Sequence, residues 1–142
     1  MTNRVLAVMA VMVVGAALAL PLGAQTLDLK ANVPFEFSFA GRTMPAGEYL
    51  FQADAGSSAF RMRNLDANVA ALGLGARPSV SGMRTESASI NFNRYGNTYF
   101  LSSMENGYTG AGFELPVTQT ERELARTASA QKYEIVAVLA RR

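Results

Sequence analysis

The chain has 142 residues, of which 49% are hydrophobic, and it carries 13 basic against 11 acidic side chains. This length leaves room for one domain, because single domains commonly span about 100–150 residues. A charge so close to balance gives no reason to expect nucleic acid or an acidic membrane surface as a partner. The chain contains no cysteine and no histidine, which excludes disulfides, cysteine nucleophiles, serine–histidine–aspartate triads and most zinc sites. We therefore expect no catalytic residue set, no metal and no cofactor.

Residues 1–24 have the pattern of a secretory signal peptide. Arg4 precedes an uncharged run that extends to Ala24, and Pro21 breaks the helix shortly before that end. The alternative is an uncleaved membrane anchor, because the uncharged run is about long enough to span a bilayer. We favour cleavage near Ala24, since no basic cluster follows it. Residues 25–142 are then one exported domain, periplasmic or extracellular, with no stable membrane span.

Strands in the first half of the mature chain are predicted from the alternation of apolar and polar residues. The segments that show it are 27–33, 35–39, 48–53, 59–63 and, more weakly, 69–74. Pro34 has no N–H for a strand ladder, so we expect the chain to cross between sheets there. Phe35, Phe37 and Phe39 share one face and are the best core candidates. Residues 77–86 and the glycine-rich 105–112 show no clear periodicity and are predicted to be loops.

The clearest hairpin of the sequence lies at residues 90–101. Ile90 and Phe92 alternate with polar residues, which is typical of a half-buried strand. Gly96-Asn97 tolerates the positive φ of a tight turn, and the apolar residues 99–101 begin the return strand. We expect the other strands of the domain to pack against this ribbon.

One helix is predicted near the C-terminus. Thr118 and Glu121 have the spacing of a capping box, directly after Pro116. Acidic residues come early and basic residues late in this segment, as the helix dipole favours. We expect a surface helix of about 10 residues with Leu124 as its main apolar contact.

The last predicted strand covers residues 133–140. Val136 and Val138 interrupt the polar alternation, which favours a strand that is covered on both faces or central to a sheet. Together these elements predict an all-β fold. The expected architecture is an antiparallel β-sandwich or small barrel of about seven strands with one short helix near the C-terminus.

Three segments of the mature chain resemble a family of small, exported, uncharacterised bacterial all-β proteins. They are NVPFEF at 32–37, MPAGEY at 44–49 and FNRYGNTYFL at 92–101, accompanied by ELP at 114–116 and the acidic start of the helix. The resemblance spans nearly the whole mature chain. Its motifs are turns and core aromatics, so it implies export and an all-β domain and transfers no activity.

Four residues near the hairpin are the candidates for surface binding: Arg94, Tyr95, Tyr99 and Tyr108. An aromatic and cationic rim of this kind can stack a sugar ring or contact a loop of a partner. The alternative is a structural turn, in which the tyrosine packs on a neighbouring strand and the arginine pairs with a glutamate.

These observations favour an exported, non-enzymatic binding or structural module of the bacterial cell envelope, whose partner is an envelope component or a glycan. A carbohydrate-binding module and a carrier of a small apolar ligand are the alternatives. The carrier requires Phe35, Phe37 and Phe39 to line a cavity of at least about 300 Å³. A third hypothesis is a hydrolase that uses Glu36 and Glu48 as paired carboxylates.

Overall fold

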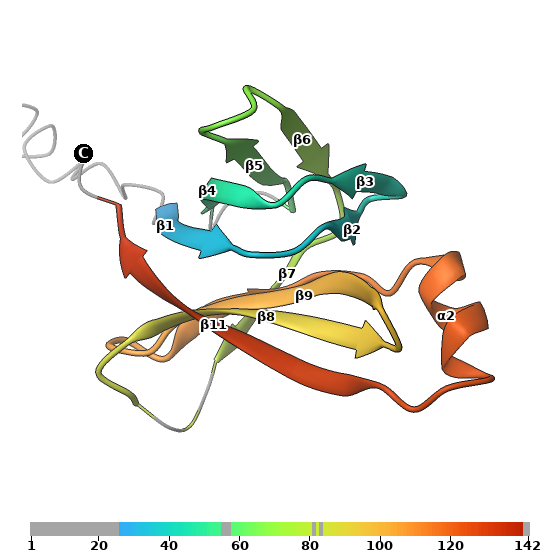
Figure 1. The fold of residues 1–142 in the computed structure, drawn as a ribbon. Coiled ribbons are helices and arrows are strands. Elements are labelled where there is room, and N and C mark those ends of the chain that lie inside the picture. Colours follow the sequence, from blue (N-terminus) through green and yellow to red (C-terminus); the bar gives the residue numbers. More distant parts are fainter. Residues whose placement is uncertain (1–25, 55–57, 81, 83, 141–142) are drawn as a thin grey trace, which may run out of the picture.

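The computed structural model describes residues 26–54, 58–80, 82 and 84–140, which form eleven strands and one short helix (Figure 1). The predicted signal peptide lies outside the described residues. The strands are β1 (Thr26–Val33), β2 (Phe37–Phe39), β3 (Arg42–Met44), β4 (Gly47–Asp54), β5 (Phe60–Asn64), β6 (Ala70–Gly73), β7 (Arg77–Val80), β8 (Ala88–Tyr95), β9 (Thr98–Asn106), β10 (Ala111–Glu114) and β11 (Gln131–Leu139), and the helix is α2 (Gln119–Ala125). The expected all-β class is therefore confirmed.

The strands form one curled, open sheet, a half-barrel with the order β3-β2-β9-β8-β11-β1-β4-β5-β6. In Figure 1 an upper half, containing β1, β4, β5 and β6, faces a lower half that contains β8, β9 and β11. The two halves are continuous where β11 pairs with β1. β10 pairs with β9, and β7 pairs with β10. The neighbours along the sheet are antiparallel except β2 and β9, which meet in one parallel pair.

Aromatic side chains from both halves fill the space between them. The Phe37 ring lies edge-on to Tyr49 of the upper half and to Phe92 of the lower half, with 5.2 Å between ring centroids in each case. Phe37 is 2% exposed, and Tyr49 and Phe92 are fully buried. Burial of such a side chain stabilises a fold by roughly 1.5–3 kcal/mol. Phe37 and Phe39 are therefore core residues as predicted, whereas Phe35 is only half-buried.

The hairpin predicted at 90–101 is confirmed and is longer than expected. β8 and β9 pair from Tyr95↔Thr98 back to Ala88↔Asn106, and Gly96 in the turn has φ +61°. Pro34 lies where the chain passes from β1, in the upper half, to β2, which pairs with β9. The chain therefore passes at this proline between two parts of one continuous sheet, and not between separate sheets as expected.

Two segments predicted to be loops contain strands instead. The interval 77–86 begins with β7, and the interval 105–112 contains the end of β9 and the start of β10. β7 and β10 have four residues each and pair with each other, with Phe113 opposite Pro78. Strands this short have too few residues to show a period, so only their pairing partner specifies them. Such short strands also explain why the described residues form eleven strands where about seven were predicted.

The helix begins where the sequence predicted, but it packs differently. Thr118 is the N-cap, and its hydroxyl accepts a hydrogen bond from the backbone N–H of Glu121. α2 has seven residues, and its buried residue is Glu121 at 3% exposure, while Leu124 is only partly covered. Leu124 is the more covered of the two apolar residues of α2, but the residue that the helix buries is a glutamate, because Asn93 and Tyr95 on β8 donate hydrogen bonds to it.

β11 is central in the sheet order, between β8 and β1, as the sequence allowed. Its outer face is nevertheless open, since Val136 and Val138 are 66% and 61% exposed. Of the two alternatives that the sequence offered, the central position is therefore confirmed and the covering of both faces is wrong. Among the described residues no helix combines the length and the apolar character that a membrane crossing requires.

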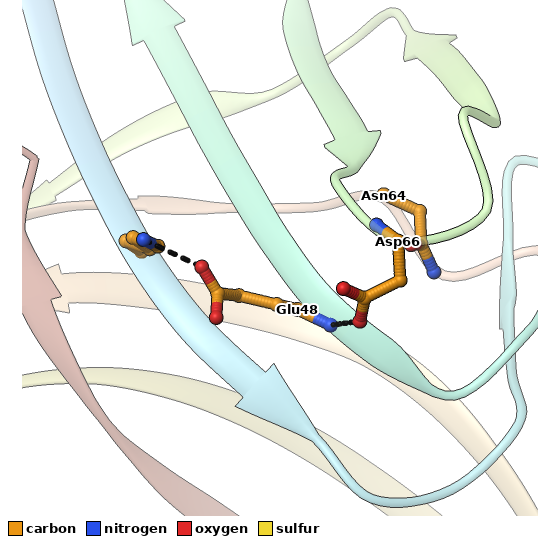
Figure 2. Close-up of polar contacts among 4 residues, drawn as sticks. Glu48, Asn64 and Asp66 are labelled. Atoms are coloured by element: carbon orange, nitrogen blue, oxygen red, sulfur yellow. Dashed lines mark hydrogen bonds and ion pairs between the residues drawn. The ribbon is translucent and has the colours of Figure 1, made fainter.

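The MPAGEY segment is held by the turn that follows β5 (Figure 2). Asn64 is fully buried, and its side chain accepts hydrogen bonds from the backbone N–H groups of Asp66 and Ala67, each at 2.8 Å. The Asp66 carboxylate in turn accepts the backbone N–H of Glu48 at 2.9 Å. Gly47 has φ +148°, and a Cβ at this position would lie 2.8 Å from the Asn64 amide nitrogen. Hydrogen bonds at this motif therefore connect the start of β4 to the turn that follows β5.

Candidate functional site

Arg94 and Tyr99 lie together at the tip of the β8–β9 hairpin, as the sequence predicted. They are cross-strand partners, and the guanidinium carbon of Arg94 lies 5.3 Å from the centroid of the Tyr99 ring. The Arg94 Nε–H donates a hydrogen bond of 2.6 Å to the carbonyl oxygen of Gly96. The turn therefore fixes the arginine over the ring, in the geometry of a cation–π contact.

Two further aromatic residues complete this site. The Phe35 ring stacks on Tyr99 with 3.8 Å between centroids and an interplanar angle of 13°. Tyr133 meets Phe35 and Tyr99 edge-on at 5.3 and 5.9 Å and is 40% exposed. We call Arg94, Tyr99, Phe35 and Tyr133 the tip cluster. Sequence reasoning placed Phe35 in the core and gave Tyr133 no role, because only the register of β11 on β8 brings Tyr133 opposite Phe92.

A groove of about 220 Å³ lies beside the tip cluster. Its lining consists of Phe35, Glu36, Phe37, Ser38, Thr43, Asn97, Thr98 and Tyr99. At about 30 Å³ per water molecule this tip groove has room for roughly seven waters, which is the scale of one small ring. Aromatic walls beside hydroxyl, amide and carboxylate groups suit a ligand that is apolar on one face and carries hydroxyl groups at its edge.

Tyr95 does not belong to the tip cluster. It is 9% exposed, and its hydroxyl donates a hydrogen bond of 3.2 Å to the Glu121 carboxylate below α2. The Asn93 amide donates to the same oxygen at 2.8 Å. Burial raises the pKa of Tyr95, and the charge of Glu121 and the hydrogen bond to it raise this pKa further. Tyr95 is thus a structural residue that attaches the helix to the sheet.

Tyr108 also lies away from the tip. It is 55% exposed in the turn between β9 and β10, whereas Tyr99 is near the start of β9. The structure therefore brings together two of the four predicted residues, Arg94 and Tyr99, and separates the other two from them. Strand alternation sends neighbouring residues to opposite faces, which is a signal that could have separated Arg94 from Tyr95.

The interior offers little room beside the three phenylalanines. The Phe39 ring packs 5.7 Å from Phe60, and the cavity next to it has about 60 Å³. The tip groove beside Phe35 and Phe37 has about 220 Å³. Both volumes are below the roughly 300 Å³ at which ligand pockets begin.

The two carboxylates of the hydrolase hypothesis have different surroundings. Glu48 forms an ion pair with Lys30, with 2.5 Å between Oε1 and Nζ, on exposed positions of β4 and β1 (Figure 2). Glu36 lines the tip groove, and Glu48 is not part of that lining. Within the described part of the chain, no three acidic residues gather as a metal ion would require.

Comparison with protein-family models, with curated proteins and with solved structures found no match to this chain. The resemblance of the three sequence segments to small exported β-proteins therefore stays a prediction.

Proposed function

We propose that the protein is an exported, non-enzymatic binding or structural module of the bacterial cell envelope. In this proposal the two halves of the curled sheet serve as the layers of a small β-sandwich that presents the tip cluster. The observation that carries the proposal is the contrast between a densely packed aromatic interior and an aromatic rim that reaches the surface. Phe37, Phe51 and Phe60 are at most 2% exposed, whereas Tyr133 at the rim is 40% exposed.

The tip cluster is suited to binding because its side chains are already ordered. The Tyr99 ring stacks on the Phe35 ring, and the guanidinium carbon of Arg94 lies 5.3 Å from the centroid of the Tyr99 ring. Arg94 is itself tied to the backbone of the turn. Each side chain immobilised on binding costs about 0.5–1.5 kcal/mol, so a rim that is ordered beforehand avoids most of that cost.

Export is supported by the sequence of residues 1–24 and by the absence of cysteine from the chain. A domain without disulfides relies on packing and strand pairing, and both are extensive in the described residues. The bacterial origin of the envelope follows from the resemblance of the three sequence segments, and so it belongs to the proposal as well.

A carbohydrate-binding role is the second candidate, and the tip groove favours it. Phe35 and Tyr99 supply aromatic surface there, and Thr43, Asn97 and Thr98 supply hydroxyl and amide groups. The carrier of an apolar ligand is less well supported, because the cavity beside Phe39 has only about 60 Å³.

The test is sedimentation of the purified full chain with isolated cell envelopes. We compare the Arg94→Ala/Tyr99→Ala variant with a matched control, Arg63→Ala/Tyr108→Ala, whose two side chains are exposed and lie away from the tip. Retention by the envelopes is expected for the natural chain and the control and is expected to fall at least about tenfold for the tip variant. Equal retention of both variants, or turnover of an envelope substrate by the chain, contradicts the proposal.

A further inference from the structure

The outer face of the lower half carries a second and larger depression. Its volume is about 490 Å³, more than twice that of the tip groove. The lining consists of Arg77, Asn91, Phe92, Asn93, Ser102, Ser103, Glu105, Glu114, Leu115, Val117, Lys132 and Glu134. We call this depression the outer trough. It is separate from the tip cluster, since none of the four cluster residues is part of this lining.

The outer trough runs across the strands. Glu134, Asn91, Ser103, Glu114 and Arg77 are successive register partners on β11, β8, β9, β10 and β7. Neighbouring strands are about 4.8 Å apart, so this row of five positions covers about 19 Å. An extended ligand could therefore contact several polar side chains in one line.

The depression arises from side-chain length. Asn91 and Ser103 in the middle of the row are short, whereas Arg77, Glu114 and Glu134 toward its borders are long. The middle strands thus form a floor, and the border strands form two walls. A floor of this kind on the outer face of a sheet leaves a hollow that the backbone alone does not create.

A β-bulge adds a second hydroxyl group to the floor. Leu101 pairs with Phe92 and Ser103 pairs with Asn91, so Ser102 is an extra residue of β9. The backbone N–H of Leu115 donates to the Ser102 carbonyl at 2.8 Å and stabilises the bulge. Bulges commonly redirect a side chain beside a functional site, and here two successive serines line the trough.

The amide groups of the floor are oriented before any ligand arrives. The Asn91 amide nitrogen donates to the Ser103 hydroxyl oxygen at 3.1 Å. The Asn93 amide nitrogen donates to the buried Glu121 carboxylate at 2.8 Å, and Tyr95 donates to the same oxygen. Both amide oxygens keep their capacity to accept, and the serine hydroxyl keeps its proton to donate. Glu121 therefore acts as a positioning residue for Asn93.

The charges of the walls are nearly balanced. Lys132 and Glu134 lie on β11, Arg77 and Glu114 lie on β7 and β10, and Glu105 adds one further carboxylate. Across the described ranges none of these five side chains forms an ion pair with another residue. A polyanion or a polycation would meet like charges on both walls, so the trough is suited to an uncharged ligand with many hydroxyl groups.

We propose that the outer trough binds a linear, uncharged glycan that lies across β11, β8, β9, β10 and β7. The alternative of an extended peptide is less favourable, because β8 and β9 already have strand partners on both sides and offer no edge to a peptide backbone. Apolar contacts at the trough come mainly from Leu115 and Val117 beside the helix. The proposal names a ligand class and a site that the tip cluster does not require.

The test is an NMR titration of the ¹⁵N-labelled full chain with two probes, the hexamers of β-1,4-linked glucose and of β-1,4-linked N-acetylglucosamine. With at least one hexamer, amide shifts are expected at Asn91, Ser103 and Lys132 and not at Tyr99. The matching monosaccharide is expected to bind at least about tenfold more weakly, because it reaches only part of the row.

The variant Asn91→Ala/Ser103→Ala is expected to weaken hexamer binding about tenfold, since it removes about two hydrogen bonds to the ligand. Lys132→Ala, at an exposed position, provides a second variant that leaves the floor intact and should also weaken binding. The matched control is Asn97→Ala/Thr98→Ala in the tip groove, which should bind as the natural chain does.

Three results would overturn the proposal. The first is the absence of shifts in the trough with both hexamers at millimolar concentration. The second is a loss of hexamer binding in the Asn97→Ala/Thr98→Ala control, which would place the sugar in the tip groove. The third is stronger binding of a mixed Lys-Glu hexapeptide at the same trough amides. The NMR shifts and hexamer affinities do not depend on whether the tip cluster retains the chain on cell envelopes. Either proposal can therefore be refuted while the other stands.

Discussion

Replacement of Asn64 by alanine tests whether the hydrogen bonds around the MPAGEY motif stabilise the fold. Asn64 is fully buried at the end of β5. Its side-chain oxygen accepts the backbone N–H groups of Asp66 and Ala67 at 2.8 Å, and its amide nitrogen donates to the Ala46 carbonyl at 3.4 Å. Asn64→Ala removes these three hydrogen bonds and introduces no group that can replace them.

The magnitude follows from the number and length of these bonds. A buried hydrogen bond contributes a net of about 0.5–1.5 kcal/mol. The two bonds of 2.8 Å count fully, whereas the bond of 3.4 Å is long and counts little. Asn64→Ala should therefore lower the free energy of unfolding by about 1–3 kcal/mol. For a domain of this size that loss corresponds to a fall in Tm of roughly 4–12 °C.

The assay is urea unfolding followed by far-UV circular dichroism. The matched control is Asn32→Ala on β1, an exposed asparagine in a strand, whose free energy of unfolding should change by less than about 0.5 kcal/mol. If Asn64→Ala and Asn32→Ala unfold at the same urea concentration, the hydrogen bonds around the MPAGEY turn do not stabilise the fold, and the reasoning is refuted.

Three further predictions concern the core, alkaline pH and the surface. Gly73→Ala should destabilise the fold by about 1–3 kcal/mol in urea, because its Cβ would lie 2.6 Å from Cζ of Phe39; an unchanged urea midpoint would argue against this contact. The pKa of Tyr95 is raised in the folded chain. The contribution of this residue to the free energy of unfolding is therefore complete below its unfolded pKa, near 10, and is lost as the pH rises from there through the higher folded pKa. Tyr95→Phe should flatten this loss in pH-dependent unfolding curves. Lys30→Ala should cost less than about 1 kcal/mol in thermal unfolding, since Lys30 and Glu48 are 45% and 40% exposed; a larger loss would show that the ion pair is stronger than surface pairs usually are.

Strong local patterns in the sequence predicted much of the fold. The alternation in β1 and β5 and the turn at Gly96 each depend on residues within a few positions of one another, and each is present in the structure. The capping of α2 by Thr118 is equally local, because an N-cap bonds a backbone group three residues later. Signals of this range can be identified before the fold is known.

Elements that depend on a distant partner were not predictable. β7 and β10 are strands because they pair with each other, and neither segment has a period of its own. The sequence identified Glu121 only as a capping-box residue, whereas in the structure it is buried because Asn93 and Tyr95 face it from β8. The buried side of α2 is thus decided by the position of the helix over the sheet.

The candidate sites divide in the same way. The sequence pointed to Arg94 and Tyr99 because an aromatic residue and a cation near a tight turn are visible locally. It did not point to Tyr133 or to the row from Glu134 to Arg77, because these residues come from separate strands that only the sheet order brings together.

By itself, then, the sequence determined that the described chain is all-β, that it uses no cysteine chemistry, and where its main turns and its one described helix begin. Only the tertiary structure decided which faces of the strands are covered and which polar side chains share a surface. The physical reason is the distance along the chain over which each interaction acts. Backbone preferences and caps act over about four residues, whereas the curl of the sheet and its strand order depend on contacts between segments far apart in the chain.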